Sequence, residues 1–208
     1  MSVRSAFVAV ALLAACASTP ETHFYRLSAP TLTLARQPVA GVLYVESFEA
    51  DAVFSDDRVV YRTSPYKLDY YNYHRWTSPP AVHLTDYLRD AYARSGLFGR
   101  VVTASTPPPD AILSGRVTGF EEVDESASVW LGRLELELTL SDAQSTAILW
   151  NQRFSESEPI AQRTPEGLAI ALSTAMERIV QSSAPALAEA MRAKAATVPG
   201  RSMPPETP

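Results

Sequence analysis

The chain has 208 residues, a formal net charge of −5 at pH 7 and a hydrophobic content of 46%. A negative balance without a lysine- or arginine-rich cluster excludes the electrostatic footprint that nucleic-acid binding requires. The length is close to that of one ordinary domain once both ends are set aside, which is enough to bury a core.

An apolar stretch at the N-terminus predicts export. Arg4 precedes an apolar run at residues 6–15. This run is too short to cross a bilayer, because a transmembrane helix needs roughly 20 residues. A basic start, a short apolar core and small residues at its end are typical of a secretory signal. We therefore expect residues 1–15 to be a signal peptide.

The residue after this run, Cys16, is the only cysteine of the chain. Residues 13–16, Leu-Ala-Ala-Cys, resemble the lipobox of bacterial lipoproteins, which implies that Cys16 is acylated and anchors the chain to a membrane. Two or more acyl chains hold a protein stably. Residues 17–18, Ala-Ser, lack the aspartate that marks inner-membrane retention in well-studied lipoproteins, which favours the outer membrane. Ordinary cleavage that releases a soluble protein is the alternative.

Proline-containing segments frame a single domain. Residues 16–38 contain three prolines and are expected to form the acylated N-terminus and a tether. Residues 193–208 contain four prolines and little periodic apolar content, which predicts a disordered tail. The remaining residues, 39–192, are expected to fold as one α+β periplasmic domain.

The first half of this domain predicts strands, then a helix. Residues 42–45 form a compact run that favours a buried strand. Two further candidate strands, 58–62 and 67–73, flank a turn-like interruption, which predicts a β-hairpin. Ser78 before two prolines predicts the cap of a helix that ends at Gly96.

The second half predicts an antiparallel meander and a second helix. Residues 111–121 and 133–140 alternate apolar with polar side chains, as strands with one wet face do, and residues 148–154 continue the pattern. A helix is expected to start at residues 164–166, and Pro185 is expected to kink or break it. The fold class predicted is α+β: a two-layer domain with a mostly antiparallel or mixed sheet and two main amphipathic helices.

Motifs for chemistry are scarce. Residues 64–67, Ser-Pro-Tyr-Lys, match the S-x-x-K pattern of penicillin-binding enzymes, but they lie between strands rather than on the helix that this chemistry needs. The acidic run 121–125 is interpreted as a solvated strand end, with a calcium loop as the weaker alternative. His23, His74 and His83 lie far apart in sequence and are expected to be surface residues. We predict no catalytic residue, no metal site and no cofactor.

The residues that carry a resemblance to a known protein family lie mainly in 58–101, and an earlier segment at 24–27 adds to it. These residues are Phe24-Tyr25-Arg26-Leu27, Tyr61-Arg62, Ser64-Pro65-Tyr66, Leu68, Tyr70-Tyr71, Arg75-Trp76, Pro79-Pro80, Leu88, Ser95-Gly96, Phe98 and Val101. On these residues the chain resembles the ABC-type transport auxiliary lipoproteins. The resemblance implies a partner, an MCE-domain protein of an ABC lipid transporter, whose conduit the lipoprotein docks at the outer membrane. It leaves open that copies of the chain form a homo-oligomeric ring.

The resemblance gives the aromatic hairpin a role. Tyrosine and tryptophan supply large contact areas at protein interfaces and keep a polar tip. The candidate partner interface consists of Arg62, Tyr66, Tyr71, Tyr73, Arg75 and Trp76. Within it we expect Trp76 to be mainly structural, together with Leu68 and Tyr70, and the other three tyrosines to be partly exposed.

The function implied is that of a non-enzymatic auxiliary component of an MCE-type ABC lipid transport system, anchored at the outer membrane. A periplasmic lipid- or glycan-binding lipoprotein, with the tyrosines lining a cleft, is the alternative. A hydrolase that uses Ser64, Lys67 or a pair of carboxylates is a third hypothesis.

Overall fold

The computed structural model describes residues 20–29, 38–104 and 108–197. Cys16 and the predicted signal peptide lie outside the described residues. The elements are β1 (His23–Tyr25), β2 (Val39–Val45), β3 (Glu49–Ala50), a 3-10 turn (Ala52–Phe54), β4 (Arg58–Ser64), β5 (Lys67–Trp76), α1 (Pro80–Arg94), β6 (Phe98–Val102), β7 (Ala111–Asp124), β8 (Trp130–Asp142), β9 (Ile148–Pro159) and α2 (Pro165–Thr197). Within these residues, no helix combines the length and the apolar character needed to cross a membrane.

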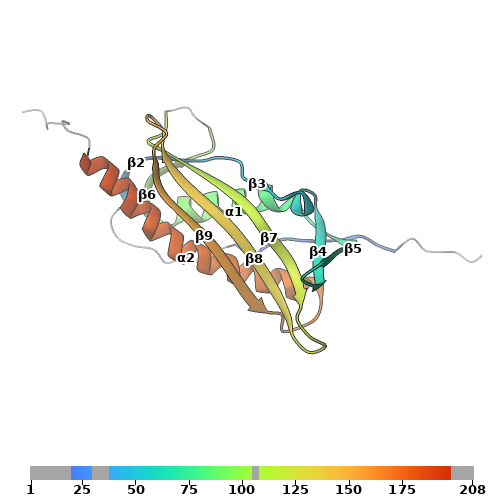
Figure 1. Cartoon of the computed structure of the whole chain (residues 1–208). Helices are drawn as coiled ribbons and strands as arrows, with labels where there is room; N and C mark the ends of the chain where they lie inside the picture. The colour runs from blue at the N-terminus through green and yellow to red at the C-terminus, as the bar shows by residue number, and fades with distance from the viewer. Residues whose placement is uncertain (1–19, 30–37, 105–107, 198–208) are drawn as a thin grey trace, which may run out of the picture.

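β7 is the central strand of a mixed sheet that has nine strands among the described residues. On one side β7 pairs antiparallel with β8, which pairs antiparallel with β9. On its other side β7 pairs in parallel with β2, then β3, then β4. β6 lies beyond β2, whereas β5 and then β1 lie beyond β4. The sheet therefore forks, and the β4–β5 hairpin lies at the opposite end of β7 from β2 (Figure 1).

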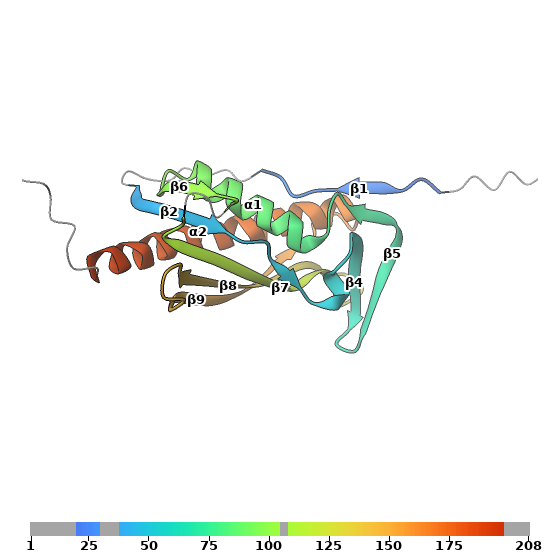
Figure 2. The ribbon, with the colours of Figure 1, turned by 90° about the horizontal axis from the view of Figure 1, so that it is seen from above.

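The two helices, α1 and α2, lie against one face of the sheet (Figure 2). β8 shows why, because its alternate residues separate into a dry face and a wetter face. Burying a leucine side chain stabilises a fold by roughly 1.5–3 kcal/mol. The fully buried leucines of β8 are Leu134, Leu136, Leu138 and Leu140. The predicted α+β domain, with two main helices and a mixed sheet, is confirmed.

The N-terminal part of the predicted tether belongs to the fold. β1 pairs in parallel with the end of β5, with His23 opposite His74 and Tyr25 opposite Trp76. Leu27 follows and is only 5% exposed. The prediction of a tether over all of residues 16–38 is therefore wrong for this part. A strand of three residues is too short to show an alternation that sequence analysis can recognise.

The helix α2 continues through Pro185 and ends at Thr197. The predicted break at Pro185 is therefore wrong, as is the prediction of disorder for residues 193–197. Packing explains the continuation, since buried side chains lie on both sides of the proline and offset the hydrogen bond that it cannot donate. These buried side chains are Ala184, Leu187, Ala188 and Met191.

The helix α1 begins and ends close to the predicted residues. Its N-cap is Pro79 rather than Ser78, and no side chain caps it. At its other end Gly96 has φ of +68°, a left-handed conformation that glycine adopts without strain. The predicted glycine stop is confirmed, and the predicted serine cap is wrong.

Candidate functional site on the β4–β5 hairpin

The β4–β5 hairpin extends away from the layer of β7, β8 and β9 (Figure 2). Residues 60–62 of β4 pair with residues 121–123 of β7 and hold one side of the hairpin. On the far side, β1 pairs only with residues 74–76 of β5. The remaining outer edge of β5 has no strand partner among the described residues, so its backbone groups are open to water or to another chain.

Two tyrosines and a leucine are the large apolar side chains that the hairpin exposes. Tyr66 in the turn is 97% exposed, and Tyr73 is 42% exposed. Leu68 is 36% exposed, so the expectation that it is structural is wrong. Tyr70 and Tyr71 are partly buried and pack against the core. The exposure expected for the three interface tyrosines is thus found, most fully at the turn.

Trp76 does not belong to the exposed surface. It is the last residue of β5 and is 1% exposed. Its ring lies 4.8 Å from that of Phe120, measured between centroids. The expectation that Trp76 is mainly structural is confirmed, and its place in the candidate interface is wrong, because the pairing of β5 with β1 carries this end of the strand into the core.

The two candidate arginines are paired within the chain. The Arg62 Nε donates to Glu121 Oε1 at 3.0 Å, and its Nη1 donates to the Pro65 carbonyl oxygen at 3.2 Å. Arg75 Nη1 donates to Asp57 Oδ1 at 2.6 Å. Both arginines therefore stabilise the hairpin itself, and their first role is to fix its shape and position.

The acidic run that follows Phe120 is largely buried. Glu121 and Glu122 are each 1% exposed, so the interpretation as a solvated strand end is wrong for these two residues. The reason is the position of β7, which has β4 on one side and β8 on the other at this point. Arg133, opposite on β8, adds a second positive charge 4.0 Å from Glu121 Oε1.

Glu122 links the base of the hairpin to the rest of the domain. Tyr71 of β5 donates its hydroxyl to the two carboxyl oxygens, at 3.2 Å each. Burial, and next the hydrogen bond and charge of Asp124, raise the pKa of Glu122 to about 7. Asp124 Oδ1 is buried and accepts no hydrogen bond from the described residues. A protonated Glu122 would supply the missing donor. Asp124 Oδ2 accepts from Arg163 Nη2 at 2.7 Å.

The hollow beside the hairpin is not lined by tyrosines. Its volume is about 610 Å³, and its walls are residues 62–65 of the hairpin together with Val123, Asp124, Glu125 and Arg133. This arrangement gives no support to the hypothesis of a tyrosine-lined cleft for a lipid or a glycan.

Ser64 and Lys67 face each other across the turn of the hairpin, in register. The Ser64 Oγ accepts a hydrogen bond from the Tyr66 amide at 3.3 Å. The helix that would place a lysine amine one turn from a serine hydroxyl is missing here, so this pair gives no support to a hydrolase. Within the described ranges, no three His, Cys, Asp or Glu side chains gather as a metal site would require.

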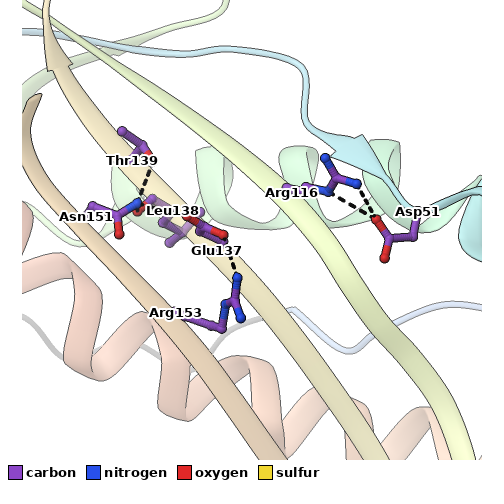
Figure 3. A network of polar contacts seen from close by, with 7 residues as sticks. All are labelled: Asp51, Arg116, Glu137, Leu138, Thr139, Asn151 and Arg153. Atoms are coloured by element: carbon purple, nitrogen blue, oxygen red, sulfur yellow. Dashed lines mark hydrogen bonds and ion pairs between the residues drawn. The ribbon is translucent and has the colours of Figure 1, made fainter.

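A second group of polar contacts covers the open face of the sheet (Figure 3). Arg153 Nη2 lies 3.2 Å from Glu137 Oε2. Asn151 Nδ2 donates to Thr139 Oγ1 at 2.8 Å. Hydrogen bonds from Asn151 and Arg153 hold the pKa of Glu137 below its usual range. These contacts are those of a solvated sheet face, as the alternation of β8 predicts.

Comparison with known proteins gives a family and a set of similar folds. Residues 25–184 match the family model described as "ABC-type transport auxiliary lipoprotein component". The Xanthomonas campestris protein XCC0632 has a similar structure, with a TM-score of 0.77 and 19% identity over 84% of this chain and 100% of that chain. An uncharacterised protein gives a TM-score of 0.64 at 19% identity, over 81% of this chain and 99% of that chain.

A Chlamydia trachomatis protein, CT253, gives a TM-score of 0.50 at 6% identity, over 74% of this chain and 98% of that chain. At these identities the solved structures show a shared fold. No curated protein matches the sequence.

Proposed function

The chain belongs to the ABC-type transport auxiliary lipoprotein family, and from this premise we propose that it is a non-enzymatic docking subunit. In this proposal the acylated Cys16 anchors the domain at the outer membrane. The β4–β5 hairpin binds an MCE-domain protein of an ABC lipid transport system, so that the lipid conduit ends at the membrane that receives the lipid.

An exposed surface of two tyrosines and a leucine on the hairpin is the observation that carries the proposal. It consists of Tyr66, Leu68 and Tyr73, of which Tyr66 is 97% exposed. Rings of this kind dominate binding energy at protein interfaces when a partner buries them. The hairpin that carries them is fixed from below by the part-buried ion pair of Arg62 with Glu121, so little order has to be gained on binding.

The position of the anchor agrees with this role. Six residues lie between Cys16 and His23, the first residue of β1. Fully extended, the chain from Cys16 to His23 spans at most about 25 Å. Because β1 pairs with β5, the tether reaches the domain beside the base of the hairpin. An acylated Cys16 would therefore hold the hairpin within a short distance of the membrane surface.

In-cell photocrosslinking tests the proposal. A photoreactive amino acid replaces Tyr66 or Tyr73 in the full-length lipoprotein, and crosslinked partners are identified by mass spectrometry. We expect an MCE-domain protein from both positions. The matched control is Ile148, which is 70% exposed on β9, and which is expected to give no such product.

Crosslinks from Tyr66 only to other copies of the chain would indicate that the hairpin is an oligomer contact and would contradict the docking role. Equal yields of the MCE-domain product from Ile148 and Tyr66 would show that the contact is not specific to the hairpin.

A further inference from the structure

The N-terminal arm, residues 23–28, is held by three different elements. Its β1 part pairs with the end of β5 (Figure 2). The Leu27 amide then donates to His83 Nε2 of α1 at 3.2 Å. The next amide, that of Ser28, donates to Ser173 Oγ of α2 at 3.0 Å. Besides the short β1 pairing and the buried Leu27 side chain, the arm is held by these two side-chain acceptors.

All three histidines of the chain gather at this arm. His23 belongs to it. The His74 ring of β5 stacks on that of His23, with 5.7 Å between centroids and 20° between planes. His74 Nδ1 is also 2.9 Å from the Tyr25 hydroxyl. His83 accepts the hydrogen bond from Leu27. Sequence analysis had treated these histidines as separate surface residues.

The contact of His83 with the arm requires a neutral ring. An amide N–H donates only to a nitrogen with a free lone pair, so Nε2 carries no proton and Nδ1 carries one. Nδ1 is buried and has no hydrogen-bond partner among the described residues. A second proton would face the Leu27 N–H and break this hydrogen bond.

The surroundings of His83 favour the neutral form. Burial, above all, lowers the pKa of His83, and the charge of Arg26 lowers it further, whereas Asp86 acts in the opposite direction. The other ionisable groups around the same hollow are Tyr87, Asp90 and Arg94.

The pKa of His74, whose ring stacks on that of His23, is also lowered. Burial and then the charge of His23 lower the pKa of His74, because two adjacent imidazolium rings repel each other. Tyr25 lies beside His74 from β1, and Tyr71 meets it edge-on with 5.6 Å between centroids. Two carboxyl groups act on the tyrosines beside His74: the charge of Glu166 acts on Tyr25, and Glu122 accepts from the Tyr71 hydroxyl.

We propose that the N-terminal arm is a pH-dependent strap, docked on α1, α2 and β5 when His74 and His83 are neutral and released when they are protonated. The ordinary histidine pKa is 6.5, and docking lowers it for His74 and His83. The released arm therefore binds protons more readily than the docked arm. Docking is complete above about pH 6.5 and weakens as the pH falls below that value.

Release changes the reach of the domain. The six residues of the arm add about 20 Å to an extended tether, and β5 loses its pairing with β1. This consequence for reach rests on the proposed anchor at Cys16, whereas the strap itself involves only described residues. If the docking role is disproved, the strap can still be tested. If the strap is disproved, the docking role can still be tested.

Amide hydrogen exchange of the full chain, purified in detergent, tests the strap without a membrane or a partner. Protection of the Leu27 and Ser28 amides is compared at pH 7.5 and 5.5 by NMR, after correction for the intrinsic rate. We expect it to fall by up to about tenfold for each titrating ring, which is the most that a group of ordinary pKa 6.5 can contribute between these two pH values. The amide of Leu136 in β8 should keep its protection.

The variant His83→Gln separates titration from packing. A glutamine carbonyl can accept from the Leu27 amide and does not titrate, so the fall in protection should become smaller. Val82→Ala, at an exposed neighbour on α1, is the control and should keep the full fall. If His83→Gln does not fold, the pKa values of His74 and His83, measured by NMR titration of the unaltered chain, test the proposal instead.

Equal protection of the arm at both pH values would overturn the proposal. So would pKa values of 6.5 or above for both His74 and His83, or an unchanged fall in folded His83→Gln.

Discussion

Glu122 is a carboxyl group whose surroundings favour its protonated form. It is 1% exposed, it accepts from Tyr71, and its neighbour Asp124 raises its pKa to about 7 together with burial. Because folding raises the pKa of this carboxyl from 4.5, its protonated form is the one that the fold favours. The group therefore contributes its full stabilisation at a pH below 4.5, where it is protonated in both the folded and the unfolded chain. This contribution is lost progressively as the pH rises through about 7.

Glu122→Gln should therefore remove this pH dependence. The glutamine amide imitates the protonated carboxyl, because it accepts from Tyr71 and donates toward Asp124. At pH 8 we expect the free energy of unfolding to rise by about 2 kcal/mol relative to the unaltered chain, and at pH 4.5 to stay nearly the same. Urea unfolding at the two pH values measures this difference.

The control for that variant is Glu125→Gln, at an exposed position of the same acidic run. It should leave the free energy of unfolding nearly unchanged. A loss of stability in Glu122→Gln at pH 8 would show that the ionised carboxyl is the stabilising form.

Substitutions of Trp76 and Tyr66 should differ in their effect on stability, because one side chain is buried and the other is exposed. Trp76→Ala removes a side chain that is 1% exposed and packed against Phe120, and is expected to cost about 3–5 kcal/mol of stability. Tyr66→Ala removes a side chain that is 97% exposed, and should change stability by no more than about 0.5 kcal/mol. Thermal unfolding measures both. A similar loss in the two variants would contradict the assignment of Tyr66 to the surface.

The helix α2 is stabilised by its packing in spite of its sequence. Pro185 lies inside it, and a proline in a helix interior costs about 3 kcal/mol through a missing hydrogen bond and a steric clash. The buried face on both sides of the proline offsets this cost. Near the C-terminal end, Lys194 Nζ lies 3.0 Å from Asp142 Oδ2 and ties the last turns to β8.

Pro185→Ala is therefore expected to stabilise the domain. Alanine restores the N–H donor and relieves the clash, although a more flexible unfolded chain takes back part of the gain. The net increase in the free energy of unfolding should be about 1–2 kcal/mol, measured by urea unfolding. A decrease would show that the proline ring fills a packing role that alanine cannot replace.

Particular elements show how far the sequence predicts this fold. The alternating leucines of β8 and the turn at residues 63–66 predict the meander and the hairpin, because both signals are local. β1 and the buried state of Glu121 and Glu122 escape prediction, because each depends on a strand that pairs from elsewhere in the chain.

The candidate site was predicted in part for the same reason. The aromatic composition points to the hairpin and to Tyr66 and Tyr73. The depth at which Trp76 is buried depends on its contact with Phe120, a residue that lies far away in sequence. The gathering of the three histidines at the N-terminal arm is likewise a consequence of tertiary structure alone.

At the scale of the whole molecule, the tether and the hairpin meet at one end of the domain. β1 receives the chain that leads from Cys16, and it pairs with the strand that forms one side of the hairpin. The two helices cover one face of the sheet, and the hairpin extends away from the layer of β7, β8 and β9 (Figure 2).

The most direct test of this account is the intact mass of the exported chain in separated membrane fractions. We predict a chain that begins at Cys16, carries acyl chains on that residue and is recovered with the outer membrane, and a Cys16→Ser variant that is not retained there. An unmodified Cys16 thiol on a chain that is released freely by osmotic shock would contradict the account.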